Sequence, residues 1–203
     1  REQFIPLHNR KQRWAAINTH RRAGKTVALV NDLIYGGLEC RLHKPQLAYV
    51  GPTYSQAKRV AWAYLKDYAE PYLSKPPQEA ELKVTLKNDA TIYVLGADNA
   101  DSLRGMYLDG CVPDEYALFK PSVFSQVIRP ALSDRHGWAI FASTPRGKNL
   151  FYDTCQVARK NPDEWFYLDL PADTSGIISP KELAELQKDM DPEEFAQEYL
   201  CSF

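Results

Sequence analysis

The segment from His20 to Thr26, HRRAGKT, has the residue types of a loop that binds phosphate groups. Backbone N–H groups at the start of a helix, together with the helix dipole, form a site for anions. Lys25 is placed to reach the β- and γ-phosphates of a nucleotide, and the Thr26 hydroxyl is placed to bind Mg²⁺. The full pattern G-x-x-x-x-G-K-[ST] requires a glycine where this chain has Thr19.

Two arginines, Arg21 and Arg22, occupy this loop. An arginine near the γ-phosphate neutralises the charge of phosphoryl transfer. Arg21 could supply it in cis while Arg22 bonds a neighbouring acid, but the sequence does not separate the two. In the alternative interpretation, Gly24 ends a turn and Lys25 is solvated. That alternative places a lysine at the positive end of a helix with no anion, which is unfavourable. The predicted nucleotide-binding residues are Arg21, Arg22, Ala23, Gly24, Lys25 and Thr26.

A pair of acids, Asp114 and Glu115, directly follows a short apolar segment in CVPDEYA. An aspartate at the end of a strand can hold Mg²⁺, whereas a neighbouring glutamate can orient and deprotonate the attacking water. The alternative is a solvated acidic turn. Pro113 lacks an N–H group, so we expect irregular pairing of this strand.

Arg104, in the segment SLRG, is a second candidate for contact with the phosphates. A lone arginine on a turn that ends in glycine could insert into a neighbouring subunit. The alternative is an ordinary surface ion pair, and the sequence does not exclude it.

The segment FASTPRGKN, residues 141–149, completes the set of candidates. Its apolar strand ends in two hydroxyl residues, Ser143 and Thr144, and Pro145 breaks the strand. The hydroxyls could sense the γ-phosphate or its attacking water. The alternative is a plain Thr-Pro turn.

The elements around these residues alternate between strands and helices along the chain. Apolar runs predict strands at 14–20, 46–52, 81–87, 91–96, 137–144 and 164–172. Helical spacing predicts helices at 25–39 (weakening at Gly36-Gly37), 54–73, 121–134, 148–161 and through the tail 179–203. This order predicts an α/β fold with a mainly parallel sheet covered on both faces. Ligands bind such sheets at the carboxyl ends of the strands, where all three motifs lie.

Composition places few limits on the function. The chain has 203 residues, 44% of them hydrophobic and 25% charged, which predicts one soluble domain. No apolar run approaches the roughly 18–20 residues that span a bilayer. The four cysteines are scattered, which favours reduced thiols over a disulfide or zinc framework. The formal net charge is −1, so a DNA partner requires a local basic patch, and NRKQR (9–13) is the candidate.

With these motifs together, the chain resembles the ATPase domain of the terminase large subunit, the DNA-packaging motor of tailed bacteriophages. The resemblance covers nearly the whole chain. It rests on HRRAGKT as a Walker A variant that contains arginine, VPDEYA as Walker B with the catalytic glutamate, and STPRGKN as the coupling motif. In this family the missing first glycine of the loop is normal.

The resemblance assigns roles residue by residue. Arg21 corresponds to the Walker A arginine that takes part in hydrolysis, Thr26 and Asp114 to Mg²⁺ ligands, and Glu115 to the catalytic acid. Arg104 corresponds to the arginine finger that one subunit supplies in trans to the nucleotide site of the next subunit. FIPLHNRKQRW resembles the adenine-binding region, where we choose Gln12 as the contact to the base. Ser143, Thr144 and Pro145 correspond to the coupling residues.

The resemblance also implies a P-loop NTPase fold of the RecA-like class, in a three-layer αβα sandwich. It implies ATP as the substrate, Mg²⁺ as the cofactor, and double-stranded viral DNA, the portal protein, the terminase small subunit and further copies in a homomeric ring as partners. We expect action in the host cytoplasm, docked transiently on the procapsid. We expect residues 1–203 to form a single motor domain whose C-terminal helical segment, about 179–203, leads to a nuclease domain absent from this chain.

Two other function classes share part of this pattern. One is another helicase-like ATPase that moves along nucleic acid, although further helicase motifs are not visible in so short a chain. The other is a nucleotide-binding module that assembles without turnover.

Overall fold

A computed structural model describes the backbone of residues 1–203 and the side chains of all of them except residues 100–102. Its seven strands form one sheet in the order β3-β4-β2-β5-β6-β1-β7. Only β3 is antiparallel to its described neighbour, β4, so the prediction of a mainly parallel sheet is confirmed. The strands are β1 Trp14–Thr19, β2 Gln46–Gly51, β3 Lys83–Thr85, β4 Thr91–Gly96, β5 Gly110–Pro113, β6 Trp138–Ser143 and β7 Trp165–Leu170.

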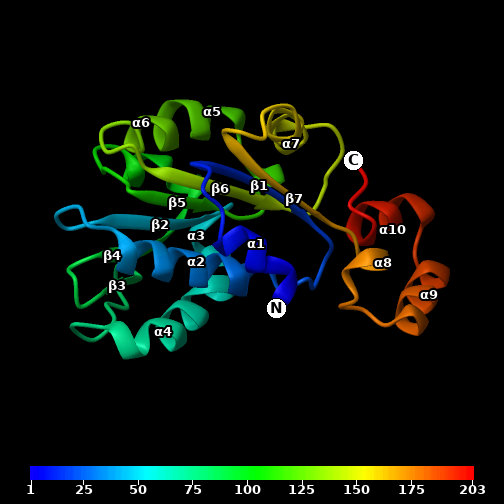
Figure 1. The fold of residues 1–203 in the computed structure, drawn as a ribbon, viewed down its shortest axis with the longest axis horizontal. Helices are drawn as coiled ribbons and strands as arrows, with labels where there is room; N and C mark the ends of the chain where they lie inside the picture. The colour runs from blue at the N-terminus through cyan, green and yellow to red at the C-terminus, as the bar shows by residue number, and fades with distance from the viewer. The chain divides into compact units, whose positions relative to one another are not determined.

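The chain divides into two compact units, and each is described by itself. The first comprises residues 1–25, 115–117 and 141–203. Here β1 pairs in parallel with β7, from Trp14 opposite Trp165 to Thr19 opposite Leu170. Helix α7 (Leu150–Lys160) packs against both strands, as Figure 1 shows. Residues 15–19 of β1 are buried, so the phosphate-loop candidates follow a rigid, fully packed strand.

The C-terminal part of the first unit is helical. It consists of α8 (Ala172–Ser175), α9 (Pro180–Asp189) and α10 (Pro192–Tyr199), which lie together near the C-terminus in Figure 1. A small core of Ala172, Phe195 and Tyr199 holds them together. Pro180 and Pro192 both stand in the first turn of a helix, as predicted. The helical tail is therefore confirmed, whereas a single domain over 1–203 stays a prediction.

The second unit comprises residues 26–114 and 118–140. Strand β2 lies between β4 and β5 in it, with Tyr49 opposite Val94 on one side and Val112 on the other. Helix α2 (Lys25–Glu39) continues through Gly36 and Gly37, where the sequence predicts weakening. A Cβ at Gly36 would lie 2.6 Å from the Trp138 ring, so this glycine permits close packing and does not end the helix.

The other predicted helices of the second unit are present but irregular. Residues 54–72 form one helical run, α3 (Tyr54–Ala57), a π-helical stretch (Lys58–Trp62), α4 (Ala63–Ala69) and a 3₁₀ turn (Glu70–Tyr72). Thr53 caps it, because its hydroxyl accepts a hydrogen bond from the Gln56 N–H at 3.2 Å. The run predicted at 121–134 consists of α5 (Pro121–Val123), a π-helical stretch (Phe124–Ile128) and α6 (Arg129–Ala131).

Some short elements are missing from the sequence prediction. They are a 3₁₀ turn at Glu2–Phe4, helix α1 (Ile5–His8), a 3₁₀ segment at Ala97–Leu103, a 3₁₀ turn at Tyr116–Leu118 and α8. Each is too short for helical spacing to become visible. Within the described part of the chain, no helix is long and apolar enough to cross a bilayer. All four cysteines are free thiols, as predicted.

Candidate nucleotide-binding site

The backbone of the loop between β1 and α2 enters the left-handed region at two residues. Arg22 has φ of 65° and Gly24 has φ of 92°, so two residues with left-handed backbone stand within three positions. At Gly24 a side chain would be strained, which explains the glycine of the motif. Arg1 lies against the outside of the loop and donates a hydrogen bond from Nη1 to the Ala23 carbonyl at 3.2 Å. The side chain of Lys25, at the start of α2, is 9% exposed.

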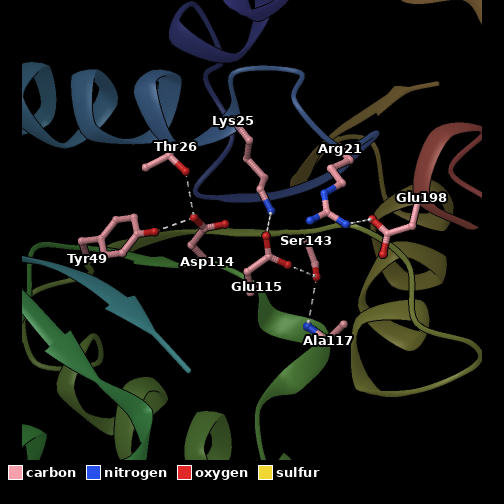
Figure 2. A network of polar contacts seen from close by, with 9 residues as sticks. All are labelled: Arg21, Lys25, Thr26, Tyr49, Asp114, Glu115, Ala117, Ser143 and Glu198. Carbon is pink, nitrogen blue, oxygen red and sulfur yellow. Dashed lines mark hydrogen bonds and ion pairs between the residues drawn. The ribbon is translucent and has the colours of Figure 1, made fainter. Parts of the chain in front are cut away.

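The beginning of the loop is tied to the C-terminal helices of the same unit. The Nε2 atom of His20 lies 3.0 Å from the Ser175 hydroxyl. The Arg21 N–H donates to the Glu198 carbonyl at 2.8 Å, and its guanidinium lies 3.7 Å from the Glu198 carboxylate (Figure 2). The Arg21 side chain remains 64% exposed.

Glu115 connects two of the predicted motifs within the first unit. Lys25 Nζ lies 2.7 Å from Glu115 Oε1, and the Ser143 hydroxyl donates to Glu115 Oε2 at 3.4 Å (Figure 2). The Ala117 N–H in turn donates to Ser143 at 3.4 Å. Glu115 itself has φ of 53°, in the left-handed region that residues other than glycine rarely adopt. The loop and the third motif therefore meet at the carboxylate of Glu115.

Asp114 and Thr26 meet in the second unit. The Thr26 hydroxyl donates to Asp114 Oδ2 at 3.4 Å, and the Asp114 residue is 2% exposed. A carboxylate and a hydroxyl are hard oxygen donors, the type that Mg²⁺ prefers. Among the described residues no group of three His, Cys, Asp or Glu could hold a metal ion. These two residues therefore fit an ion that takes its other ligands from phosphate oxygens and water, as Mg²⁺ does at nucleotides.

The family follows from comparison with known proteins. The sequence profile of the family described as "Terminase large subunit, T4likevirus-type, N-terminal" matches residues 17–203. The chain belongs to this family. The large terminase subunit of Thermus phage G20c is 51% identical over 57 residues, 28% of this chain and 12% of that protein. That of Escherichia phage T5 is 27% identical over 149 residues, 71% of this chain and 33% of that protein. The chain thus spans a third or less of these relatives.

Solved terminase structures have the same fold. The ATPase domain of the large terminase of Thermus phage P74-26 superposes with a TM-score of 0.82 at 25% identity, over 98% of this chain and 92% of that one. The large terminase of a second thermophilic bacteriophage, in complex with ATP-gamma-S, superposes with a TM-score of 0.81 at 17% identity, over 99% of this chain and 52% of that one. The expected family and the α/β P-loop NTPase fold are therefore confirmed.

Gln12, the residue chosen for the base in this terminase chain, lies at the end of β1 opposite the loop. It precedes β1, and its amide donates to the Pro162 carbonyl at 3.1 Å, just ahead of β7. The six residues of β1 separate it from the loop by about 20 Å. Gln3 is the glutamine near the loop, since its amide donates to the Ser175 carbonyl at 2.8 Å.

Two cavities lie beside the predicted arginines. One, of about 580 Å³, has Arg22 and Arg1 on one side and residues of α9 and α10 on the other. Arg22 therefore faces this cavity, whereas Arg21 pairs with Glu198. Arg104 lines a second cavity of about 340 Å³ in the second unit, together with Gln126 and Asp134.

Thr144 and Pro145 follow Ser143 beyond the end of β6, and Pro145 is buried. Of this motif, the structure thus brings Ser143 to the predicted catalytic acid. Sequence reasoning missed Tyr49, whose hydroxyl bonds to Asp114, and Ser175 and Glu198, which hold the loop. No local pattern marks them, because each lies far along the chain from its partner.

Proposed function

We propose that this chain hydrolyses ATP and that the hydrolysis drives double-stranded viral DNA into the procapsid. The observation that carries the proposal is the contact of 2.7 Å between Lys25 and Glu115, with Ser143 on the second oxygen of the same carboxylate. This contact brings the lysine proposed to bind phosphate next to the carboxylate proposed as the general base. Membership of the terminase family supports the same function.

The phosphates of ATP bind to N–H groups where the loop enters α2, and to Lys25. Lys25 exchanges its bond to Glu115 for the phosphate oxygens, which frees the carboxylate. Glu115 then takes a proton from the attacking water, while Ser143 holds its other oxygen and fixes its orientation. The exposed Arg21 guanidinium moves from Glu198 to the γ-phosphate, where it neutralises charge that develops during transfer.

Thr26 and Asp114 would hold Mg²⁺ in this site. When bound, the ion neutralises the β- and γ-phosphate oxygens. Asp114 is buried and hydrogen-bonded, so its carboxylate is already oriented before the ion arrives. The nucleoside fits the cavity beside Arg22, whose apolar walls include Ile177, Ile178 and Leu186. This assignment replaces Gln12 as the contact to the base.

The partners follow from the family. We infer that the protein forms a homomeric ring in which Arg104 reaches the nucleotide of the next subunit. We infer that this ring docks on the portal protein in the host cytoplasm and that the small subunit supplies it with DNA. The net charge of −1 means that any DNA contact depends on local patches such as residues 9–13.

Glu115→Ala tests the proposal. We expect nucleotide affinity, measured with a fluorescent ATP analogue, to stay within a few-fold of the unmutated protein, and phosphate release to fall at least about a hundredfold. Glu185→Ala, an exposed acid on α9, is the matched control and should keep both values.

Three results would contradict the proposal. Binding with no turnover in the unmutated protein would favour the module without hydrolysis. Turnover stimulated by single-stranded DNA but not by procapsids that carry the portal would favour a helicase-like ATPase. Full activity of Glu115→Ala would remove Glu115 from the reaction.

A further inference from the structure

Tyr49 makes a contact that the proposed chemistry does not yet use. It lies in β2, is 2% exposed, and donates a hydrogen bond from its hydroxyl to Asp114 Oδ2 at 2.5 Å (Figure 2). Both residues belong to the second unit. A buried carboxylate cannot replace such a donor with bulk water, so this bond fixes which way Asp114 points.

Strand β2 also holds the backbone of Asp114. Val50 lies opposite Pro113 in the parallel register, and the Asp114 N–H donates to the Val50 carbonyl at 2.9 Å. In this register the donor to Val50 is the Asp114 N–H, so the bond does not need the N–H group that Pro113 lacks. Two consecutive residues of β2 thus hold one aspartate, one by its main chain and the other by its carboxylate.

The bond from Tyr49 to Oδ2 is shorter than the bond that Thr26 makes to the same oxygen. Thr26 reaches this oxygen at 3.4 Å, which is long for a hydroxyl donor, since such bonds are usually about 2.7–2.8 Å. Thr26 can therefore leave this oxygen for a metal ion while the carboxylate stays bonded to Tyr49. Partners behind a metal ligand set its orientation, and their loss typically lowers metal affinity about 10–100-fold.

We propose that Tyr49 is the positioning residue for the carboxylate that binds Mg²⁺: its hydroxyl holds Asp114 in the orientation in which Asp114 and Thr26 face one ion. The proposal rests on the proposed function, because the ion enters with the nucleotide. It predicts that removal of one hydroxyl on β2 weakens metal binding without weakening the binding of metal-free nucleotide.

Tyr49→Phe is the test, with Mn²⁺ as the paramagnetic probe and ADP as the nucleotide. Free Mn²⁺ is titrated by electron paramagnetic resonance in the presence of protein and ADP. We expect the apparent Kd for Mn²⁺ to rise about tenfold or more, and the affinity for ADP in EDTA to stay unchanged. Tyr107→Phe is the matched control, since its hydroxyl donates to the Lys44 carbonyl at 3.1 Å, and it should leave both values unchanged.

A double variant separates positioning from a general structural effect. In Asp114→Asn the carboxylate is absent, so adding Tyr49→Phe should change the Mn²⁺ affinity no further. An additional loss of the same size in the double variant would overturn the proposal, as would an unchanged or tighter Kd in Tyr49→Phe alone. If the unmutated protein binds ADP but no Mn²⁺ with it, the proposal fails while nucleotide binding stands. If it binds no nucleotide at all, the proposed function fails as well.

Discussion

The bond between His20 and Ser175 makes a quantitative test of how the phosphate loop is held. His20 is 1% exposed, and its Nδ1 atom lies 2.7 Å from the Arg21 carbonyl. A carbonyl can only accept, so we assign the proton of the neutral ring to Nδ1, which leaves Nε2 as the acceptor of the Ser175 hydroxyl. The same hydroxyl lies 3.3 Å from the Ala172 carbonyl and accepts from the Ile177 N–H at 3.2 Å. Ser175→Ala therefore removes a partner from the buried His20 acceptor and from the Ile177 donor.

The expected loss follows from the burial of the ring. An unpaired buried acceptor destabilises the folded state by about 1–3 kcal/mol, so we expect about 2 kcal/mol and a fall in Tm of about 4–8 °C for a chain of this size. The measurement is urea denaturation and thermal melting, followed by circular dichroism. Thr174→Ala is the control, because its hydroxyl is exposed and donates only to the Pro171 carbonyl at 3.3 Å. We expect its effect to stay below about 0.5 kcal/mol.

The pH dependence of the free energy of unfolding gives a second test of His20. Burial lowers the pKa of His20 below its ordinary value of 6.5. The unfolded chain then binds a proton that the folded chain does not, so the stabilisation is fully present above pH 6.5 and is lost as the pH falls toward the folded pKa. We expect His20→Gln to remove this contribution. Equal losses in Ser175→Ala and Thr174→Ala, or an unchanged acid dependence in His20→Gln, would refute the reasoning.

Two further predictions concern other parts of the chain. Mixing Arg104→Ala protein with Glu115→Ala protein should restore part of the phosphate release, since each subunit supplies what its neighbour lacks; no rescue at high protein concentration would exclude a trans role for Arg104. Burial raises the pKa of Cys155 to about 12 from 9.0. The contribution of the Cys155 thiol to the free energy of unfolding is therefore complete below pH 9 and falls by about 1.4 kcal/mol per pH unit above pH 9. Denaturation at pH 8 and pH 10 should show a smaller alkaline loss for Cys155→Ala, and equal losses would contradict the effect.

The sequence predicted those parts of the site that depend on local patterns. The strand before His20, the G-K-T motif and the helix from Lys25 to Glu39 follow from neighbouring residues alone. The meeting of Glu115 with Ser143 was predictable for a different reason. Both residues come at the ends of apolar strands, and parallel strands bring their carboxyl ends to one edge of a sheet.

Other contacts could not be predicted, since they depend on register and on packing between distant segments. Tyr49 has the pattern of any buried strand residue, and only the register of β2 against β5 brings it to Asp114. The sequence predicts a weakening of the helix at Gly36, whereas the structure places the Trp138 ring against this glycine. Gln12 is a different case, because the order of Gln12, β1 and the loop along the chain already places it at the end of the strand away from the loop.

The order of events in the proposed cycle follows from the two partners of Lys25, which are the Glu115 carboxylate and, once ATP is bound, the phosphate groups. While Lys25 is bonded to Glu115, its ammonium neutralises the carboxylate and occupies Oε1, so this oxygen is not available to the attacking water. A triphosphate that attracts Lys25 removes this neutralisation at the moment when a base is needed. We expect Ser143 to keep its bond to the other oxygen and so to hold the orientation of the carboxylate. In the proposed cycle, nucleotide binding therefore draws Lys25 away from Glu115 and leaves Oε1 of the carboxylate to the attacking water.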